Sequence, residues 1–115
     1  RVQWAQTDAA RLPIEPERVD RLIYFSVWPH FDNFDVILDE AVRVLRPGGR
    51  LHVWHTISRD RVNAIHSEAS EAVKDDLLEP AEVTATRIRA RGFAVDVVED
   101  GGRYLVSATR PVETP

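Results

Sequence analysis

The 115-residue sequence contains no cysteine and no methionine. The lack of cysteine excludes disulfides, catalysis by a thiolate and zinc sites built on thiolates, although it leaves the cellular compartment open. The lack of methionine means that the sequence, which begins at Arg1, does not include a translational start. We therefore expect that further residues precede Arg1 in the parent protein.

Long apolar runs and an excess of basic residues are also missing. No apolar run approaches the roughly 18 residues of a membrane-spanning helix, and no signal peptide is visible, so we expect a cytoplasmic protein with no membrane partner. Fifteen Lys and Arg residues stand against nineteen Asp and Glu residues, which gives a formal net charge of −4. Because nonspecific nucleic-acid binding depends mainly on clustered cations, we expect no nucleic-acid partner.

The residues that are present describe a small globular domain. Hydrophobic residues make up 43% of the sequence and charged residues 30%, and the length fits a single core. We find no internal repeat and no obvious linker. The sequence therefore predicts one domain over residues 1–111, followed by a tail over residues 112–115.

The first half of the sequence alternates between strand and helix patterns. Alternating residues predict a short strand over 2–6, and the nearly continuous apolar run at 20–27 indicates a strand covered on both faces, as in a parallel sheet. Apolar residues recur with the helical period over 34–45. The Pro-Gly-Gly stretch at 47–49 is expected to stop that helix, and a strand over 50–56 is expected to follow.

The second half predicts two helices and a hairpin. Ser58 is suited to cap a helix that we expect to reach Lys74. Pro80 is suited to the first turn of another helix, which is expected to end at Gly92 with a left-handed cap. Residues 93–110 predict two antiparallel strands around a glycine turn. The predicted class is α/β.

Taken together, three stretches resemble the C-terminal part of a class I S-adenosylmethionine-dependent methyltransferase of the type that methylates small molecules. They are VQWAQTDAARLP, then VDRLIYFSVWPHF with the helix FDVILDEAVRVLRPGGRLHV, and finally RGFAVDVVEDGGRYLVSATRP. The resemblance implies a Rossmann-like sheet, mostly parallel with a C-terminal antiparallel hairpin, in the strand order 3-2-1-4-5-7-6. The predicted strands correspond to strands 3 to 7, so the first two are expected to be absent from this chain.

The resemblance also implies S-adenosylmethionine as the cofactor. In this family a glycine-rich loop and an acidic residue, which belong to the first two strands, contact the cofactor, and the sequence contains no GxGxG. We therefore expect this chain to hold at most half of the cofactor site. The resemblance assigns Asp8 and Ala9 to the adenine, although Asp8 could instead cap the following turn. It places Phe25, Ser26 and Val27 beside the cofactor cleft.

The resemblance places Trp28 and Phe31 in a loop over the substrate, although both could be core residues. His30 is a candidate general base, with an ordinary exposed loop histidine as the alternative. His55 and His66 could converge with His30 on a substrate pocket, could bind a metal, or could be scattered structural or surface residues. We expect no metal, and a catalytic base is not obligatory, because methyl transfer needs mainly alignment of the reacting atoms.

The expected function is that of the C-terminal portion of a methyltransferase acting on a small molecule, with the isolated chain inactive. The alternative is a noncatalytic binding or interaction module, derived from a methyltransferase, that no longer binds the cofactor. The strand at 20–27 would have an open edge if the first strand is absent. We expect the missing N-terminal segment or a second copy to pair there, and the alternative is that residues 2–7 move into the vacancy.

Overall fold

The computed structural model of the chain describes residues 8–31, 33–56, 58–67 and 77–112. The strand predicted over residues 2–6 lies outside the described residues. The described helices and strands are, in chain order, β1 (Val19–Phe25), the 3-10 helix η1 (Trp28–His30), α1 (Phe34–Val44), β2 (Leu45–His55), α2 (Arg59–Ser67), α3 (Ala81–Arg89), β3 (Ala94–Asp100) and β4 (Tyr104–Thr109).

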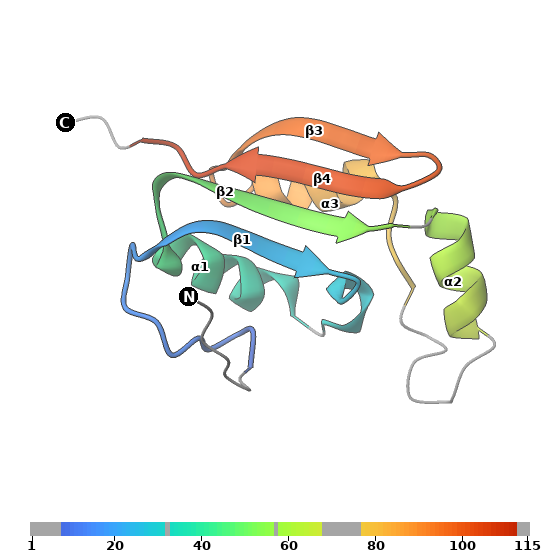
Figure 1. Cartoon of the computed structure of the whole chain (residues 1–115), viewed down its shortest axis with the longest axis horizontal. Helices are drawn as coiled ribbons and strands as arrows, with labels where there is room; N and C mark the ends of the chain where they lie inside the picture. Colours follow the sequence, from blue (N-terminus) through green and yellow to red (C-terminus); the bar gives the residue numbers. More distant parts are fainter. Residues whose placement is uncertain (1–7, 32, 57, 68–76, 113–115) are drawn as a thin grey trace.

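The strands form one sheet in the order β1-β2-β4-β3 (Figure 1). β1 and β2 are parallel, whereas β4 is antiparallel to both of its neighbours, β2 and β3. This is the order expected for strands 4, 5, 7 and 6 of the methyltransferase sheet. The prediction of an α/β Rossmann-like fold is confirmed, with a mixed sheet in the described part of the chain.

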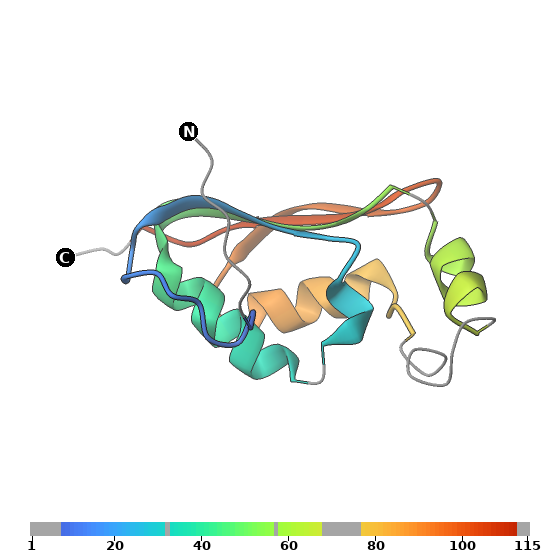
Figure 2. The same cartoon turned by 60° about the horizontal axis from the view of Figure 1, so that its bottom comes forward.

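Helices α1 and α3 cover one face of the sheet, and α2 lies beyond its end (Figure 2). Both covering helices turn an apolar side toward the strands, where alternate residues point inward because the period of a strand is two. The fully buried core residues include Leu38, Ala41, Leu45, Leu51, Val53, Ala85, Ile88 and Val106. This single core fixes the ends of the strands relative to one another.

The Pro-Gly-Gly stretch lies inside β2, which corrects the prediction that it separates a helix from a later strand. α1 ends at Val44 and β2 begins directly at Leu45. Val19 pairs with Leu45 and Arg21 pairs with Arg50, so two steps along β1 oppose five along β2. The additional residues of β2 form an irregularity in the strand.

Glycine is needed in this irregularity for two reasons. Gly48 has a φ of +81°, a left-handed conformation that glycine adopts at little cost. A Cβ on Gly49 would lie 2.8 Å from the carbonyl oxygen of Arg46 and 3.1 Å from that of Asp20. The backbone of β1 therefore approaches β2 as closely as it does only because residue 49 has no side chain.

The ends of α2 and α3 are partly as predicted. The Ser58 hydroxyl accepts a hydrogen bond from the amide of Arg61 at 3.2 Å, so the predicted cap is confirmed. α2 is described as far as Ser67, and the continuation predicted to Lys74 lies outside the described residues. α3 ends at Arg89, and Gly92, with a φ of +88°, donates to the Arg89 carbonyl at 2.9 Å.

After β4 the chain leaves the sheet, and Val112 is 71% exposed. The predicted boundary between the domain and a tail at residue 112 is not tested beyond that exposure and stays a prediction. Within the described ranges, no helix combines the length and apolar character needed to cross a membrane.

Candidate functional site at the carboxyl ends of the strands

The carboxyl ends of β1 and β2 lie side by side at one end of the sheet, because the two strands are parallel (Figure 1). Phe25 pairs with Trp54, and the amide of Ser26 donates to the Trp54 carbonyl at 2.9 Å. Ligands of open α/β sheets bind outside the carboxyl ends of the strands. This end of the sheet is therefore the candidate site.

Ser26 forms a turn of unusual backbone conformation at this end of the sheet. Its φ is +57°, which is uncommon for a residue other than glycine and costs of order 1–3 kcal/mol. The residues on either side are solvent-accessible, with Phe25 48% exposed and Val27 38% exposed. The three residues predicted to lie beside the cofactor thus form an exposed turn that leads from β1 into η1.

An aromatic cluster below this turn holds it against the core. The Trp28 ring lies 5.4 Å from the Tyr24 ring, 5.6 Å from the Phe31 ring and 5.0 Å from the Phe34 ring, measured between centroids. Trp28 is fully buried, and Phe31 is partly buried against the core. The described structure thus places the Trp28 ring in the core, and the substrate contacts predicted for Trp28 and Phe31 stay predictions.

Asp8 caps its own turn, which is the alternative left open by the sequence. Its Oδ1 accepts from the amide of Ala10 at 2.9 Å, and its carbonyl accepts from the amide of Arg11 at 2.9 Å. The side chain is exposed, whereas Ala9 packs partly against the core. A carboxylate has a second acceptor oxygen, so this turn leaves Asp8 capable of another hydrogen bond, and the adenine contact stays a prediction.

An ion pair on α1 fixes the stretch between Asp8 and β1. Glu40 accepts from the Nε of Arg43 at 2.6 Å and from the amide of Leu12. Arg43 also donates to the carbonyl oxygens of Ile14 and Leu12, at 2.7 and 3.0 Å. The hydrogen bond from Arg43 is the main reason why the pKa of Glu40 falls to about 2.

The structure describes one of the three candidate histidine side chains. His55 is buried at the carboxyl end of β2, and its ring meets the Tyr104 ring edge-on at 5.8 Å. His30 lies in η1 and His66 in α2, but their side chains are not among those described. The predicted convergence on a substrate pocket therefore stays a prediction. Over the described residues, no group of three or more metal-ligating side chains is arranged to hold an ion.

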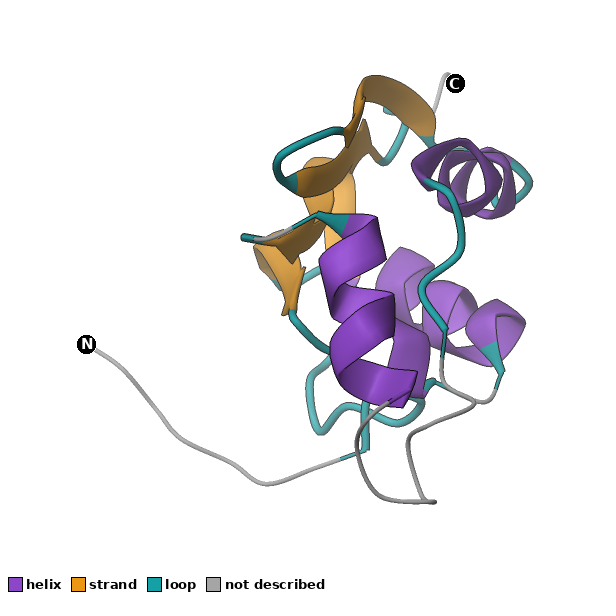
Figure 3. Cartoon of the chain, turned by 90° about the vertical axis from the view of Figure 1, so that its right-hand side faces the viewer, coloured by secondary structure: helices purple, strands orange, loops and turns teal. Residues whose placement is uncertain are grey.

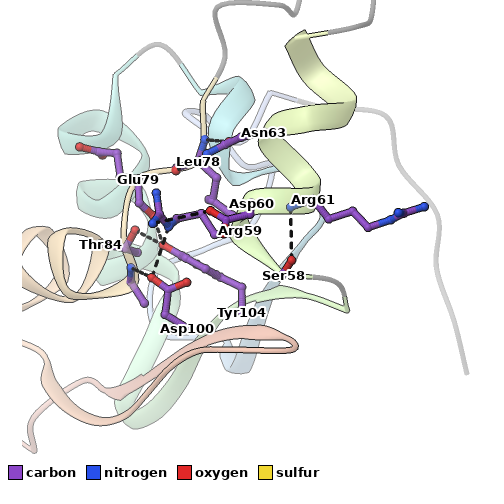
Figure 4. Close-up of polar contacts among 11 residues, drawn as sticks. Ser58, Arg59, Asp60, Arg61, Asn63, Leu78, Glu79, Thr84, Asp100 and Tyr104 are labelled. Carbon is purple, nitrogen blue, oxygen red and sulfur yellow. Dashed lines mark hydrogen bonds and ion pairs between the residues drawn. The ribbon is translucent and has the colours of Figure 1, made fainter.

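Sequence reasoning missed a polar cluster at the same end of the sheet (Figure 4). A cavity of about 170 Å³ is lined by Ser58, Arg59, Asp60, Asp100 and Gly101. Asp100 accepts from the amide of Ala81 at 2.9 Å, and its carboxylate lies 3.5 Å from the Nε of Arg59. The acidic pair before the hairpin glycines was the signal in the sequence, but no role was predicted for it.

Tyr104 connects this cluster to α3. Its hydroxyl lies 2.6 Å from the Thr84 hydroxyl and donates to the Glu79 carbonyl at 2.8 Å (Figure 4). Burial raises the pKa of Tyr104 to about 12, so the phenol is neutral at physiological pH. The arrangement serves to hold the start of β4 against α3.

Comparisons with known proteins agree with this fold. Residues 1–53 match the family described as "Methyltransferase domain". Methyltransferase GfsG of Streptomyces halstedii is 31% identical over 71 residues, which cover 62% of this chain and 26% of that protein. The match spans about a quarter of GfsG.

Solved structures extend the likeness to nearly the whole chain. A S-adenosylmethionine-dependent methyltransferase of Thermotoga maritima, described as a possible histamine N-methyltransferase, has a TM-score of 0.73 at 20% identity, over 90% of this chain and 62% of that one. A putative methyltransferase of Bacillus halodurans has a TM-score of 0.71 at 18% identity, over 96% of this chain and 78% of that one. The predicted resemblance is confirmed: the chain has the fold of the class I S-adenosylmethionine-dependent methyltransferases, and residues 1–53 match the methyltransferase-domain family.

Proposed function

We propose that this chain is the C-terminal portion of a cytoplasmic S-adenosylmethionine-dependent methyltransferase that transfers a methyl group to a small molecule. The single observation that supports this best is the exposed, left-handed turn at Ser26, at the carboxyl end of a parallel strand in a methyltransferase fold. Backbone strain of this kind concentrates at functional sites.

The described residues fit part of the cofactor. Asp8 offers an exposed carboxylate for the adenine amino group, Ala9 follows it with a backbone amide, and the turn from Phe25 to Val27 offers exposed apolar and hydroxyl groups. A GxGxG loop for the methionine portion is absent from the sequence. When bound, the cofactor supplies the activated methyl group. In the proposal, Phe25 and Val27 exclude water from it while Asp8 orients the adenine.

The acceptor is proposed to bind above the same turn. Trp28 and Phe31 position the loop that borders the acceptor, and His30, His55 and His66 face its polar groups, with His30 as the candidate base. Because displacement at a methyl group needs mainly alignment of the reacting atoms, the histidines are expected to affect turnover more than cofactor affinity. The position of His55 at the carboxyl end of β2 supports its inclusion.

The second candidate function is a noncatalytic binding or interaction module. The absence of GxGxG from the sequence and the open outer edge of β1 favour it, since β1 has a neighbour on only one side in the described sheet. We propose that a missing N-terminal segment, or else a second copy, pairs with this edge. An open strand edge is prone to pairing with another chain.

The two candidates are separated by cofactor binding in the full-length product of the gene. Asp8→Asn keeps an oxygen for the Ala10 amide but replaces the second acceptor oxygen with a donor. We expect Asp8→Asn and Asp8→Ala to weaken S-adenosylmethionine binding by about 1–3 kcal/mol in calorimetric titration. A full-length wild-type protein with no measurable cofactor binding would favour the noncatalytic module. Wild-type affinity in both variants would leave Asp8 as a turn cap alone.

A further inference from the structure

The polar cavity is the space of about 170 Å³ lined by Ser58, Arg59, Asp60, Asp100 and Gly101. It lies at the end of the sheet that faces the viewer in Figure 3, which is also the end that carries the turn at Ser26. Pockets that take a whole drug-sized ligand measure roughly 300–1,000 Å³. The polar cavity is smaller, so it suits one end of a longer ligand.

The strand register fixes how far this cavity lies from the turn. His55 is paired with Tyr104, and Tyr104 is paired with Asp100, so the three residues form a row across β2, β4 and β3. Ser26 adjoins this row on β1, since its amide donates to the carbonyl of Trp54. Neighbouring strands lie about 4.8 Å apart, so three spacings place Asp100 about 14 Å from Ser26.

Arg59 has hydrogen-bonding capacity that the described protein does not use. Its side chain is 34% exposed, and its charged partners among the described residues are distant, Asp100 at 3.5 Å and Asp60 at 3.9 Å. Strong bonds between guanidinium and carboxylate groups measure about 2.7–2.9 Å. The Nε of Arg59 is buried and donates no hydrogen bond to another described residue. The guanidinium can therefore donate to a group in the cavity.

Acceptors and a second donor lie beside it. Asp100 accepts from the Ala81 amide through Oδ2, the same oxygen that lies near Arg59, so its Oδ1 keeps the capacity to accept. The Ser58 hydroxyl accepts from the Arg61 amide, which leaves its own hydrogen available to donate. The cavity thus presents donors and an acceptor together.

This mixture is matched by a neutral ligand better than by an ionic one. Arg59 carries one positive charge, and Asp60 and Asp100 carry two negative charges. A carboxylate or phosphate group in the cavity would lie beside Asp100, and an ammonium group would lie beside Arg59, where like charges repel. A hydroxyl group can both donate and accept, so adjacent hydroxyls complement Arg59 and Asp100 at the same time.

We propose that the polar cavity binds the hydroxyl-rich end of an elongated neutral acceptor, such as a sugar ring, about 14 Å from the methylated atom near Ser26. Arg59 donates to one hydroxyl, and Asp100 accepts from its neighbour. The proposal rests on the methyltransferase function, because that function supplies the acceptor.

The test uses methyl β-D-glucopyranoside as the probe, titrated without cofactor into the ¹⁵N-labelled full-length product of the gene and followed by amide chemical shifts. Tetrahydropyran, which has the same ring without hydroxyls, is the control ligand. Arg59→Lys keeps a positive charge beside Asp100 but loses the planar fork of donors. Arg61→Lys is the matched control on the same helix, because the Arg61 side chain points away from Arg59 (Figure 4).

We expect the glucoside, and not tetrahydropyran, to shift the amides of Arg59 and Gly101. Arg59→Lys should weaken this binding by about tenfold, as loss of a hydrogen bond to a charged group does, and Arg61→Lys should leave it unchanged. Absence of these shifts, equal shifts from tetrahydropyran, or wild-type binding in Arg59→Lys would overturn the proposal.

A second probe tests whether the cavity belongs to the acceptor site. Hexyl β-D-glucopyranoside should bind in the same place and add shifts at His55 and Ser26, and shifts confined to the cavity would overturn that assignment. Glucoside binding by a protein that does not bind S-adenosylmethionine would refute the methyltransferase function. Cofactor binding without glucoside binding would refute only the present proposal.

Discussion

At the scale of the residue, the close backbone contacts of Gly49 lead to a prediction about the stability of the fold. Gly49→Ala places a methyl group 2.8 Å from the Arg46 carbonyl and 3.1 Å from that of Asp20, and both are backbone atoms that cannot rotate away. We expect a loss of about 1–3 kcal/mol in the free energy of unfolding, measured in urea. Gly101→Ala is the control, because a Cβ there meets nothing within 4 Å. Equal stability of the two variants would show that β1 and β2 have room to separate.

The lowered pKa of Glu40 leads to a prediction of how the stability of the fold depends on pH. Its pKa falls from the ordinary 4.5 to about 2 in the folded protein, chiefly through the hydrogen bond from Arg43. A lowered pKa stabilises the fold above the unfolded value, and that contribution is lost as pH falls from 4.5 toward 2. Glu40→Gln should therefore flatten the dependence of unfolding free energy on pH in this window. A wild-type slope in Glu40→Gln would mean that other groups dominate acid unfolding.

At the scale of the element, the start of α3 depends on a residue from the hairpin. Pro80 occupies the N-cap position without a side-chain cap, and Asp100 of β3 accepts from the Ala81 amide instead. Asp100→Ala should cost about 0.5–2 kcal/mol, as loss of a cap does, and should speed hydrogen exchange in the first turn of α3. Asp100→Asn retains an acceptor oxygen and should cost less. Unchanged exchange in Asp100→Ala would contradict this role.

The elements also show what the sequence could predict. The helical period over 34–45 and the apolar run at 20–27 anticipated α1 and β1 within a residue or two, because both patterns arise from burial against one core. The start of β2 was wrong by five residues, since Pro-Gly-Gly ordinarily ends structure. Here Gly48 donates to the Arg110 carbonyl at 2.8 Å and Gly49 accepts from the Arg110 amide at 2.9 Å, and no local pattern contains these contacts. The role of Asp100 at α3 depends on a contact across 19 positions, which no local pattern contains.

At the scale of the whole molecule, the order of the strands in the sheet was predicted from the resemblance to the methyltransferase family. No local pattern in the sequence gives that order. The end of the strand at residues 25–27 was predicted, but the left-handed turn at Ser26 was not, since serine carries no signal for positive φ. The sequence also did not predict that the described chain leaves one face of the sheet uncovered. The run at 20–27 predicts burial on both sides, whereas the described structure covers only one.

The central claim is that this chain contributes half of a cofactor site, through Asp8, Ala9 and the turn from Phe25 to Val27. Titration of S-adenosylmethionine into the ¹⁵N-labelled 115-residue chain, followed by amide chemical shifts, tests it most directly. The account predicts shifts confined to these residues that do not saturate below about millimolar concentration, because the missing glycine loop would supply much of the polar recognition. Saturation at micromolar concentration, shifts centred elsewhere, or no shift at these residues would contradict it.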